Sequence, residues 1–200
     1  MAGEDAAPAA PLPGENWTLR VPLADLEDTE RFAHRLAGEL RAGTLLVLTG
    51  GLGAGKTTFT QSLAEGLGVA GQVSSPTFVL SRIHRSGGDG PDLVHVDAYR
   101  TDAEGLESLD LLSTLPGSVT VVEWGRGVVE QALTGEHGSW LDLELLREQP
   151  AQEVPAEDAQ GSGIITDFSE SEEDILGTPR TAVLRGYGAA FPSPPDSLLP

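Results

Sequence analysis

Cysteine is absent from this chain of 200 residues, and lysine occurs only once. The absence of cysteine excludes a disulfide framework, a thiol nucleophile and a metal site built on thiolates. Histidine is also scarce, and the spacing of the four histidines is unlike that of metal ligands. We interpret each of them as a surface or hydrogen-bonded residue: His34, His84, His95 and His137.

Long hydrophobic runs are missing as well. No run of about 18 apolar residues is present, so the sequence predicts no membrane-spanning helix. Residues 1–16 lack the apolar segment of a signal peptide. We therefore expect a cytoplasmic protein that does not associate with a membrane.

Positive charge is in short supply. Lysine and arginine total 12 against 31 aspartates and glutamates, which gives a formal net charge of −19. An acidic surface repels the phosphate backbone of nucleic acids. If the protein serves a nucleic acid, we expect a partner to make most of the contacts.

Apolar periodicity divides the chain into alternating strands and helices. The expected helices are 25–43, 56–68, 102–115 and 127–133, and the expected strands are 17–23, 44–50, 92–100, 118–124, 139–146 and 180–188, with another at the end of 73–84. Such alternation is typical of an α/β domain. It predicts a sheet with a parallel core, antiparallel edge strands and helices on both faces.

Composition sets the expected boundaries of this domain. Residues 1–16 are rich in alanine and proline and are expected to form a disordered leader, and residues 190–200 form a tail. Residues 147–178 hold nine acids and one arginine, which predicts an acidic disordered insertion. The folded domain then comprises residues 17–146 and a final strand within residues 179–189.

The sole lysine, Lys56, lies in GGLGAGKT at residues 50–57, which matches the pattern G-x-x-x-x-G-K-[ST]. An apolar strand precedes this stretch and a helix follows it, as a P-loop requires. Glycines let the backbone N–H groups point toward phosphate oxygens, and the start of the helix adds its positive dipole end. The pattern predicts a P-loop NTPase in which Lys56 contacts the phosphates and Thr57 contacts Mg²⁺.

Two acidic residues end neighbouring strands of the expected sheet. Asp97 follows LVHV, and Glu123 follows VTVV. Ligands of open α/β sheets bind at the carboxyl ends of the strands, so both side chains are expected to face the phosphates. Either one could instead cap a helix or pair with an arginine.

Two further residues are candidates with an alternative. Thr77 lies in SSPTF at residues 74–78 and could sense the γ-phosphate, although an ordinary proline turn fits the same stretch. Trp124 could stack near the nucleotide or pack in the core. A guanine-specific N-K-x-D motif cannot occur, because Lys56 is the only lysine. A small-molecule kinase and a nucleotide switch that hardly hydrolyses ATP stay open as alternatives.

Four stretches in this order carry a family resemblance: GGLGAGKTTFTQSLAEGLG, VSSPTFVL, LVHVDAYR and VVEW. Together they resemble the TsaE family, bacterial ATPases needed to make threonylcarbamoyladenosine in tRNA. The resemblance covers about residues 17–146, and the closing RTAVLRGYG is similar to the last strand of the family. It implies a hydrolase that binds ATP and Mg²⁺.

The resemblance also implies roles for individual residues. Thr57 and Glu123 would hold Mg²⁺, and Lys56 would bind the phosphates. Asp97 would serve hydrolysis as a base, as a water-positioning group or as an indirect partner of Mg²⁺. The expected nucleotide contacts are Thr29, Gly51, Leu52, Gly53, Ala54, Gly55, Lys56, Thr57, Thr58, Thr77 and Trp124.

Partners are implied by the same resemblance. TsaE proteins act with TsaB and TsaD, and TsaD carries out the transfer to adenosine. We therefore expect weak ATPase activity alone, TsaB and TsaD homologues as partners, and tRNA reached through them. One residue departs from the usual family loop G-D-L-G-A-G-K-T, because Gly51 replaces the aspartate. Phosphate binding should survive, since that side chain is not part of the backbone cradle.

Overall fold

The structure is a computed structural model that describes residues 7–74, 76, 80–99, 110–147 and 178–199. Three sequence predictions fall wholly or largely outside these ranges. They are the sensor Thr77, the helix expected at 102–115 up to residue 109, and the insertion expected at 147–178, apart from its ends.

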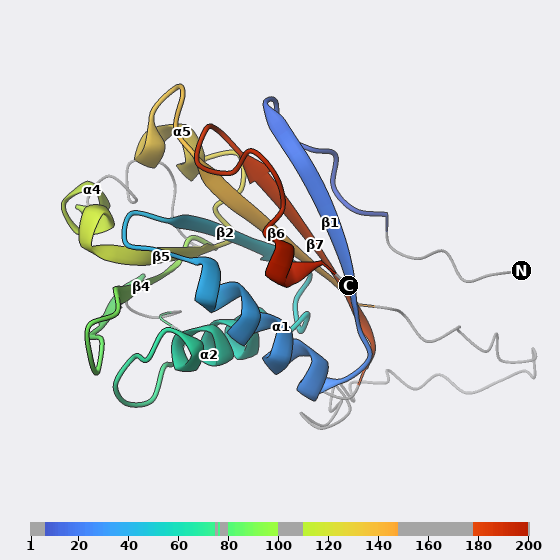
Figure 1. The fold of residues 1–200 in the computed structure, drawn as a ribbon, viewed down its shortest axis with the longest axis horizontal. Coiled ribbons are helices and arrows are strands. Elements are labelled where there is room, and N and C mark those ends of the chain that lie inside the picture. Colours follow the sequence, from blue (N-terminus) through green and yellow to red (C-terminus); the bar gives the residue numbers. More distant parts are fainter. Residues whose placement is uncertain (1–6, 75, 77–79, 100–109, 148–177, 200) are drawn as a thin grey trace, which may run out of the picture.

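The described residues form a seven-stranded sheet in the order β1-β7-β6-β2-β5-β4-β3 (Figure 1). Its strands are β1 (Glu15–Leu23), β2 (Leu45–Gly50), β3 (Ser81–His84), β4 (Asp92–Asp97), β5 (Ser118–Glu123), β6 (Trp140–Arg147) and β7 (Arg180–Tyr187). The pairs β6–β2, β2–β5 and β5–β4 are parallel, and the pairs β1–β7, β7–β6 and β4–β3 are antiparallel. The predicted parallel core with antiparallel outer strands is confirmed.

Helices cover both faces of this sheet. α1 (Leu26–Glu39) and α2 (Lys56–Gly66) lie side by side on one face (Figure 1), where they pack on Leu46 and Leu48 of β2. The other face packs against α4 (Leu111–Thr114) and α5 (Val129–Thr134) through Leu45 and Val47. Because successive strand residues point to opposite faces, a continuous apolar run in β2 supplies both cores. Two short 3-10 helices complete the described elements, η1 (Leu115–Gly117) and η2 (Asp196–Leu198).

The two long helices begin near their predicted residues and end earlier. Asp25 caps α1, and its Oδ1 accepts the backbone N–H of Asp28 at 2.9 Å. α1 ends at Glu39, before the predicted end at Gly43, which instead forms the turn into β2 with φ of 90°. α2 ends at Gly66, two residues before Gly68, where φ is 73°. Glycine after a helix marks the end of the turn that closes it rather than the last helical residue.

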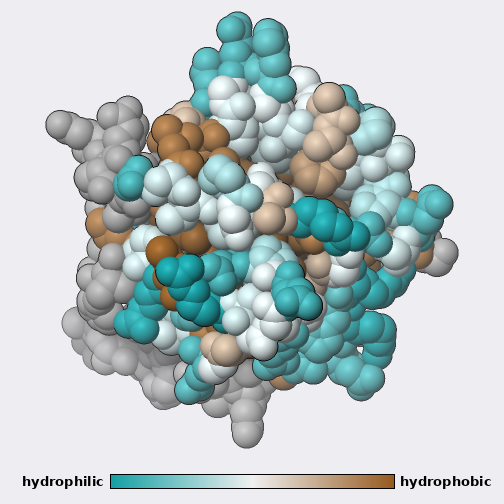
Figure 2. All heavy atoms as spheres, turned by 60° about the vertical axis from the view of Figure 1, so that its left-hand side comes forward, coloured by the Kyte–Doolittle hydropathy of each residue, from teal (hydrophilic) through white to brown (hydrophobic). Residues whose placement is uncertain are grey.

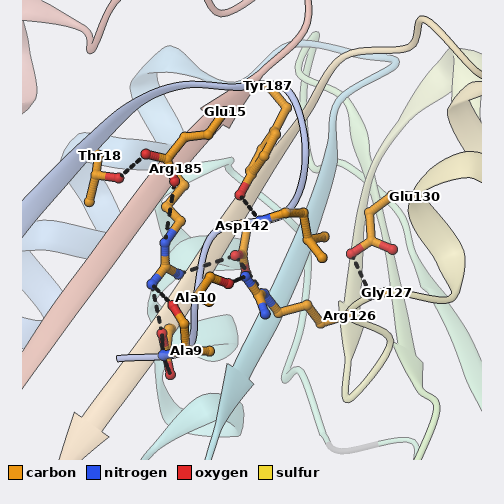
Figure 3. Close-up of polar contacts among 12 residues, drawn as sticks. Ala9, Ala10, Glu15, Thr18, Arg126, Gly127, Glu130, Asp142, Arg185 and Tyr187 are labelled. Atoms are coloured by element: carbon orange, nitrogen blue, oxygen red, sulfur yellow. Dashed lines mark hydrogen bonds and ion pairs between the residues drawn. The ribbon is translucent and has the colours of Figure 1, made fainter. Parts of the chain in front are cut away.

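The N-terminal residues correct one prediction. β1 begins at Glu15 rather than at residue 17, and residues 9–12, assigned to a disordered leader, bind the sheet through their main chain. They cover a group of buried and half-buried charged and hydroxyl side chains that we call the arginine cluster (Figure 3): Glu15, Arg126, Asp142, Glu144, Arg185 and Tyr187. The alanine- and proline-rich composition did not reveal these contacts, because backbone groups make them.

Apolar side chains are also found on the surface. The large exposed ones include Ile83 on β3, Leu112 on α4 and Val128 before α5. Figure 2, which brings the left side of Figure 1 forward, shows apolar and polar side chains interspersed over this face. Among the described helices, none is both long and apolar enough to cross a lipid bilayer.

Candidate phosphate-binding site

The loop between β2 and α2 depends on glycine at two positions. A Cβ on Gly50 would lie 2.6 Å from the backbone oxygen of Leu145, and φ of Gly50 is 142°. Gly55, the N-cap of α2, has φ of 92°, and a Cβ there would lie 3.3 Å from Nε of Arg180. Side chains at either position would force the loop away from the sheet. The glycines of the P-loop pattern therefore serve the curled backbone that the sequence predicts.

The start of α2 differs from the start of α1. Asp25 caps α1, and Glu27 and Asp28 lie in its first turn. The N-cap of α2 is a glycine without a capping side chain, and its first turn contains no acid. The first N–H groups of α2 therefore lack an intrahelical acceptor, and its first turn carries no acid to offset the positive dipole end. Both properties favour an anion at this end of the helix.

Lys56 folds back over this loop. Its Nζ donates to the backbone oxygens of Gly50 at 2.9 Å and Gly51 at 3.0 Å, and it lies 3.8 Å from the ring centroid of Trp124. Burial lowers the pKa of the Lys56 ammonium, and the charges of Glu123 and Asp97 oppose that shift. The cation is thus held by neutral groups, which leaves it able to bind phosphate oxygens.

Glu123 connects the loop helix to the sheet. Its Oε1 lies 3.4 Å from Oγ1 of Thr57 and 2.8 Å from Nε2 of His95. The alternation of strand residues explains this meeting, because Leu93 of β4 and Val121 of β5 face α1 and α2. Every second residue of a strand points to the same face. His95 and Asp97 therefore share the face of Leu93 in β4, and Glu123 shares the face of Val121 in β5. We call Lys56, Thr57, His95, Asp97 and Glu123 the phosphate-site cluster.

Asp97 and Glu123 are register partners at the ends of β4 and β5. Both are buried, as expected for acids at the carboxyl ends of central strands. Oδ1 of Asp97 accepts the backbone N–H of Tyr99 at 3.0 Å, which fixes the carboxylate at the start of the following loop. Neither acid caps a helix in the described residues, so the alternative role of a helix cap is not observed for them there.

Trp124 continues the chain just beyond Glu123 with an unusual backbone. Its φ is 64°, in the left-handed region that non-glycine residues seldom occupy, and its N–H donates to the oxygen of Leu48. The ring lies against both Lys56 and Tyr99, whose ring centroid is 5.2 Å away. The half-buried ring belongs to neither apolar core and lies beside Lys56, and its stacking near a nucleotide stays a prediction.

The remaining predicted contacts lie on or beside the loop, with two exceptions. Gly51, Leu52, Gly53 and Ala54 form the loop itself, and Thr58 lies in the first turn of α2. Thr29 instead lies in the first turn of α1, where its hydroxyl donates to the oxygen of Asp25 at 3.0 Å. Its proximity to a nucleotide stays a prediction. Thr77, the second exception, lies outside the described residues.

Two residues at the site were missed by sequence reasoning. His95 was interpreted as a surface or hydrogen-bonded residue, and the hydrogen bond is confirmed, but its place at the site was not predicted: the side chain is fully buried against Glu123. Strand alternation could have predicted this position, because LVHVD places His95 on the same strand face as Asp97. Arg180 of β7 donates from Nε to the backbone oxygen of Ala54 at 2.9 Å and so connects the loop to the sheet. No local pattern indicates this contact, since the two residues lie far apart in the sequence.

Comparison with known proteins connects this geometry to a family. The family model described as threonylcarbamoyl adenosine biosynthesis protein TsaE matches residues 23–154. The chain belongs to the TsaE family. A TsaE protein of Streptomyces coelicolor is 62% identical over 99 residues, which cover 48% of this chain and 67% of that protein. A TsaE protein of Mycobacterium tuberculosis is 44% identical over 133 residues, which cover 62% of this chain and 77% of that one.

A solved structure supports the same fold. The crystal structure of Bacillus subtilis YdiB is similar with a TM-score of 0.58 and 26% sequence identity, covering 86% of this chain and 87% of that one. The TsaE family model spans Thr29, the loop, Asp97 and Glu123. The departure at Gly51 lies within it. A Cβ on Gly51 would meet no atom within 4 Å, so the loop has space for the aspartate that the family resemblance led us to expect.

Proposed function

We propose that the chain is a Mg²⁺-dependent ATPase subunit of the TsaE type, which supports threonylcarbamoyl transfer to adenosine in tRNA by a TsaB–TsaD complex. The observation that carries the ATPase proposal is the phosphate-site cluster at an uncapped helix start. There the lysine and a threonine hydroxyl at the start of α2 lie beside two buried carboxylates, which end β4 and β5. Membership of the TsaE family supports the connection to tRNA modification.

The residues present fit the triphosphate of ATP. The amides at the start of α2 have no intrahelical acceptor, and within the described part of the chain Lys56 is held by backbone oxygens and the face of Trp124. Lys56 can exchange those backbone oxygens for phosphate oxygens, which are charged and therefore stronger acceptors. The loop amides and Lys56 would bind the phosphates, and Trp124 would limit the access of water to them.

The residues also fit Mg²⁺. This ion prefers oxygen ligands, and it keeps several waters while taking one or two protein ligands and substrate phosphates. The Thr57 hydroxyl and the Glu123 carboxylate provide such oxygens, 3.4 Å apart. When bound, Mg²⁺ would neutralise charge on the phosphates. Asp97, one strand away from Glu123, would serve hydrolysis at the same edge of the sheet.

The charge of the chain supports the proposed division of labour. With a net charge of −19 the chain is poorly suited to bind tRNA directly. TsaB and TsaD homologues would supply the tRNA contacts and, in TsaD, the transfer itself. The proposal places all of these proteins in the cytoplasm.

The proposal is tested by mixing the chain with TsaB and TsaD homologues and tRNA, then following ADP release and tRNA modification together. We expect both to depend on the complete mixture. Lys56→Ala should weaken ATP binding by roughly 30-fold, because a charge-assisted contact contributes about 2 kcal/mol, and should abolish modification. Arg41→Ala removes a positive charge at the other end of β2 and serves as the control with no expected effect.

Other outcomes separate the alternatives. ADP release that requires an added small-molecule acceptor, and not the partner proteins, would establish a kinase. ATP binding without any turnover in the complete mixture would establish a nucleotide switch. Modification supported equally by Lys56→Ala and the parent would refute the proposed role of the loop.

A further inference from the structure

His95 is fully buried beneath the phosphate-site cluster, and none of the roles proposed above uses it. It lies on β4, two residues before Asp97 and on the same face of the sheet. Its Nε2 is 2.8 Å from Oε1 of Glu123, and both side chains are almost inaccessible to solvent. A contact this short between buried groups is a strong hydrogen bond when the donor and acceptor are correctly matched.

The surroundings of the imidazole define which nitrogen carries the proton. Nδ1 of His95 is buried and has no hydrogen-bond partner among the described residues. A proton on Nδ1 would leave a buried donor unpaired and would turn the lone pair of Nε2 toward a carboxylate. A proton on Nε2 instead gives Glu123 a donor and leaves only an acceptor unpaired, which costs less free energy. The geometry therefore favours Nε2–H donating to Oε1.

We infer that His95 is a positioning residue that holds the Glu123 carboxylate in the orientation needed to bind Mg²⁺ beside Thr57. The inference rests on the proposed function, because it assumes that Glu123 contributes to a Mg²⁺ site. Among the described residues, the hydrogen bonds to the Glu123 carboxylate, from His95 and from Thr57, use Oε1. Oε2 is then left to face the cation directly or through a water molecule.

Other residues would perform this task less well. An arginine or lysine at position 95 would bring a second permanent cation close to Lys56 and to the Mg²⁺ site. An apolar residue would leave Glu123 free to rotate away from Thr57. Hydrogen-bonding partners that orient metal ligands typically change metal affinity by about 10- to 100-fold when they are removed.

The test measures binding of a fluorescent N-methylanthraniloyl derivative of ATP, first in EDTA and then over a titration with Mg²⁺. In His95→Leu we expect the affinity in EDTA to stay within about twofold of the parent. The Mg²⁺ concentration that gives half of the affinity gain should rise by about 10- to 100-fold. His95→Gln places an amide N–H near the former Nε2 and should recover most of this response.

Leu93→Val is the matched control, because it changes a buried residue on the same strand and face without touching a polar group. It should leave the Mg²⁺ titration as in the parent. The inference is overturned if His95→Leu shows the parent's Mg²⁺ dependence, if it loses affinity equally with and without Mg²⁺, or if His95→Gln is no better than His95→Leu. A parent that binds the nucleotide in neither condition would instead refute the proposed function itself.

Discussion

The arginine cluster and the phosphate-site cluster lie on opposite faces of the same sheet, and both bury charged side chains. In the arginine cluster, charges meet directly. Oδ2 of Asp142 lies 2.8 Å from Nε of Arg126 and 3.2 Å from Nη1 of Arg185, and Arg185 also contacts Glu144 at 3.0 Å (Figure 3). In the phosphate-site cluster, Lys56 contacts backbone oxygens and an aromatic ring rather than Glu123 or Asp97.

This difference is the one expected between a structural cluster and the ligand site proposed above. Burial raises the pKa of Asp142, and Arg126 and Arg185 oppose this shift. The arginine cluster therefore contains its own countercharges. Backbone groups of Ala9, Ala10 and Leu12 add hydrogen bonds to Glu144, Tyr187 and the two arginines. In the phosphate-site cluster, the start of α2 has no capping side chain, and Lys56 forms no salt bridge with the acids of the described residues. Mutations in the first should therefore affect stability and those in the second should affect binding.

The largest effect on stability is expected from Arg185→Met. This substitution leaves buried Asp142 and Glu144 without a principal countercharge, and breaking a buried ion pair in this way costs about 3–5 kcal/mol. Urea unfolding should show this loss, while nucleotide affinity of the folded fraction stays near that of the parent. Arg31→Met removes an exposed arginine from an ion pair and is the matched control with a much smaller loss. A small effect of Arg185→Met would contradict a stabilising role for the cluster.

A smaller loss of stability is expected when residues 1–12 are deleted. The deletion removes the main-chain contacts of Ala9 and Leu12 with Glu144 and Tyr187, and the contact of Ala10 with Arg126. With about 1 kcal/mol for each hydrogen bond and partial compensation by water, the free energy of unfolding should fall by about 2 kcal/mol. Ala10→Ser keeps the main chain and should unfold like the parent. An unchanged stability after the deletion would mean that these contacts do not hold the sheet together.

The smallest expected effect is a pH dependence at Lys56. Because the folded pKa of this ammonium lies below the unfolded value of about 10.4, the unfolded chain takes up the proton first as the pH falls. The parent should therefore gain stability relative to Lys56→Met as the pH rises through the interval between the two pKa values. Lysine labelled with ¹³C at Cε gives one NMR signal, which reports the folded pKa directly. A pKa at or above the ordinary value would show that Glu123 and Asp97 outweigh burial.

Much of the fold could be predicted because strand and helix periods are local properties. The buried run at β2 predicted a central strand of the sheet, and the polar ends of β4 and β5 predicted that Asp97 and Glu123 lie at one edge of it. The early ends of α1 and α2 were missed, because a glycine can lie in the turn after a helix as well as at its end. The bound N-terminal residues were missed because alanine and proline carry no sign of the backbone hydrogen bonds that they make.

The candidate site was predictable only in part. The loop, Thr57, Asp97 and Glu123 follow from a contiguous motif and from the topology of the sheet. His95 could have been added by extending the strand alternation from Asp97, but its pairing with Glu123 depends on the register between β4 and β5. Arg180 reaches Ala54 across more than a hundred residues of sequence, and such a contact exists only once β6 and β7 have paired.

The single lysine has a practical consequence for chemical labelling. Lys56 is 6% exposed, and it is the only side chain in the protein with a primary amine. Once its reaction with the α-amino group is subtracted, a reagent that acylates amines would therefore report the accessibility of one loop, and an occupied loop should shield Lys56. Immobilisation through lysine would select molecules whose loop has opened, so a tag elsewhere on the chain is the better attachment for measurements of nucleotide exchange.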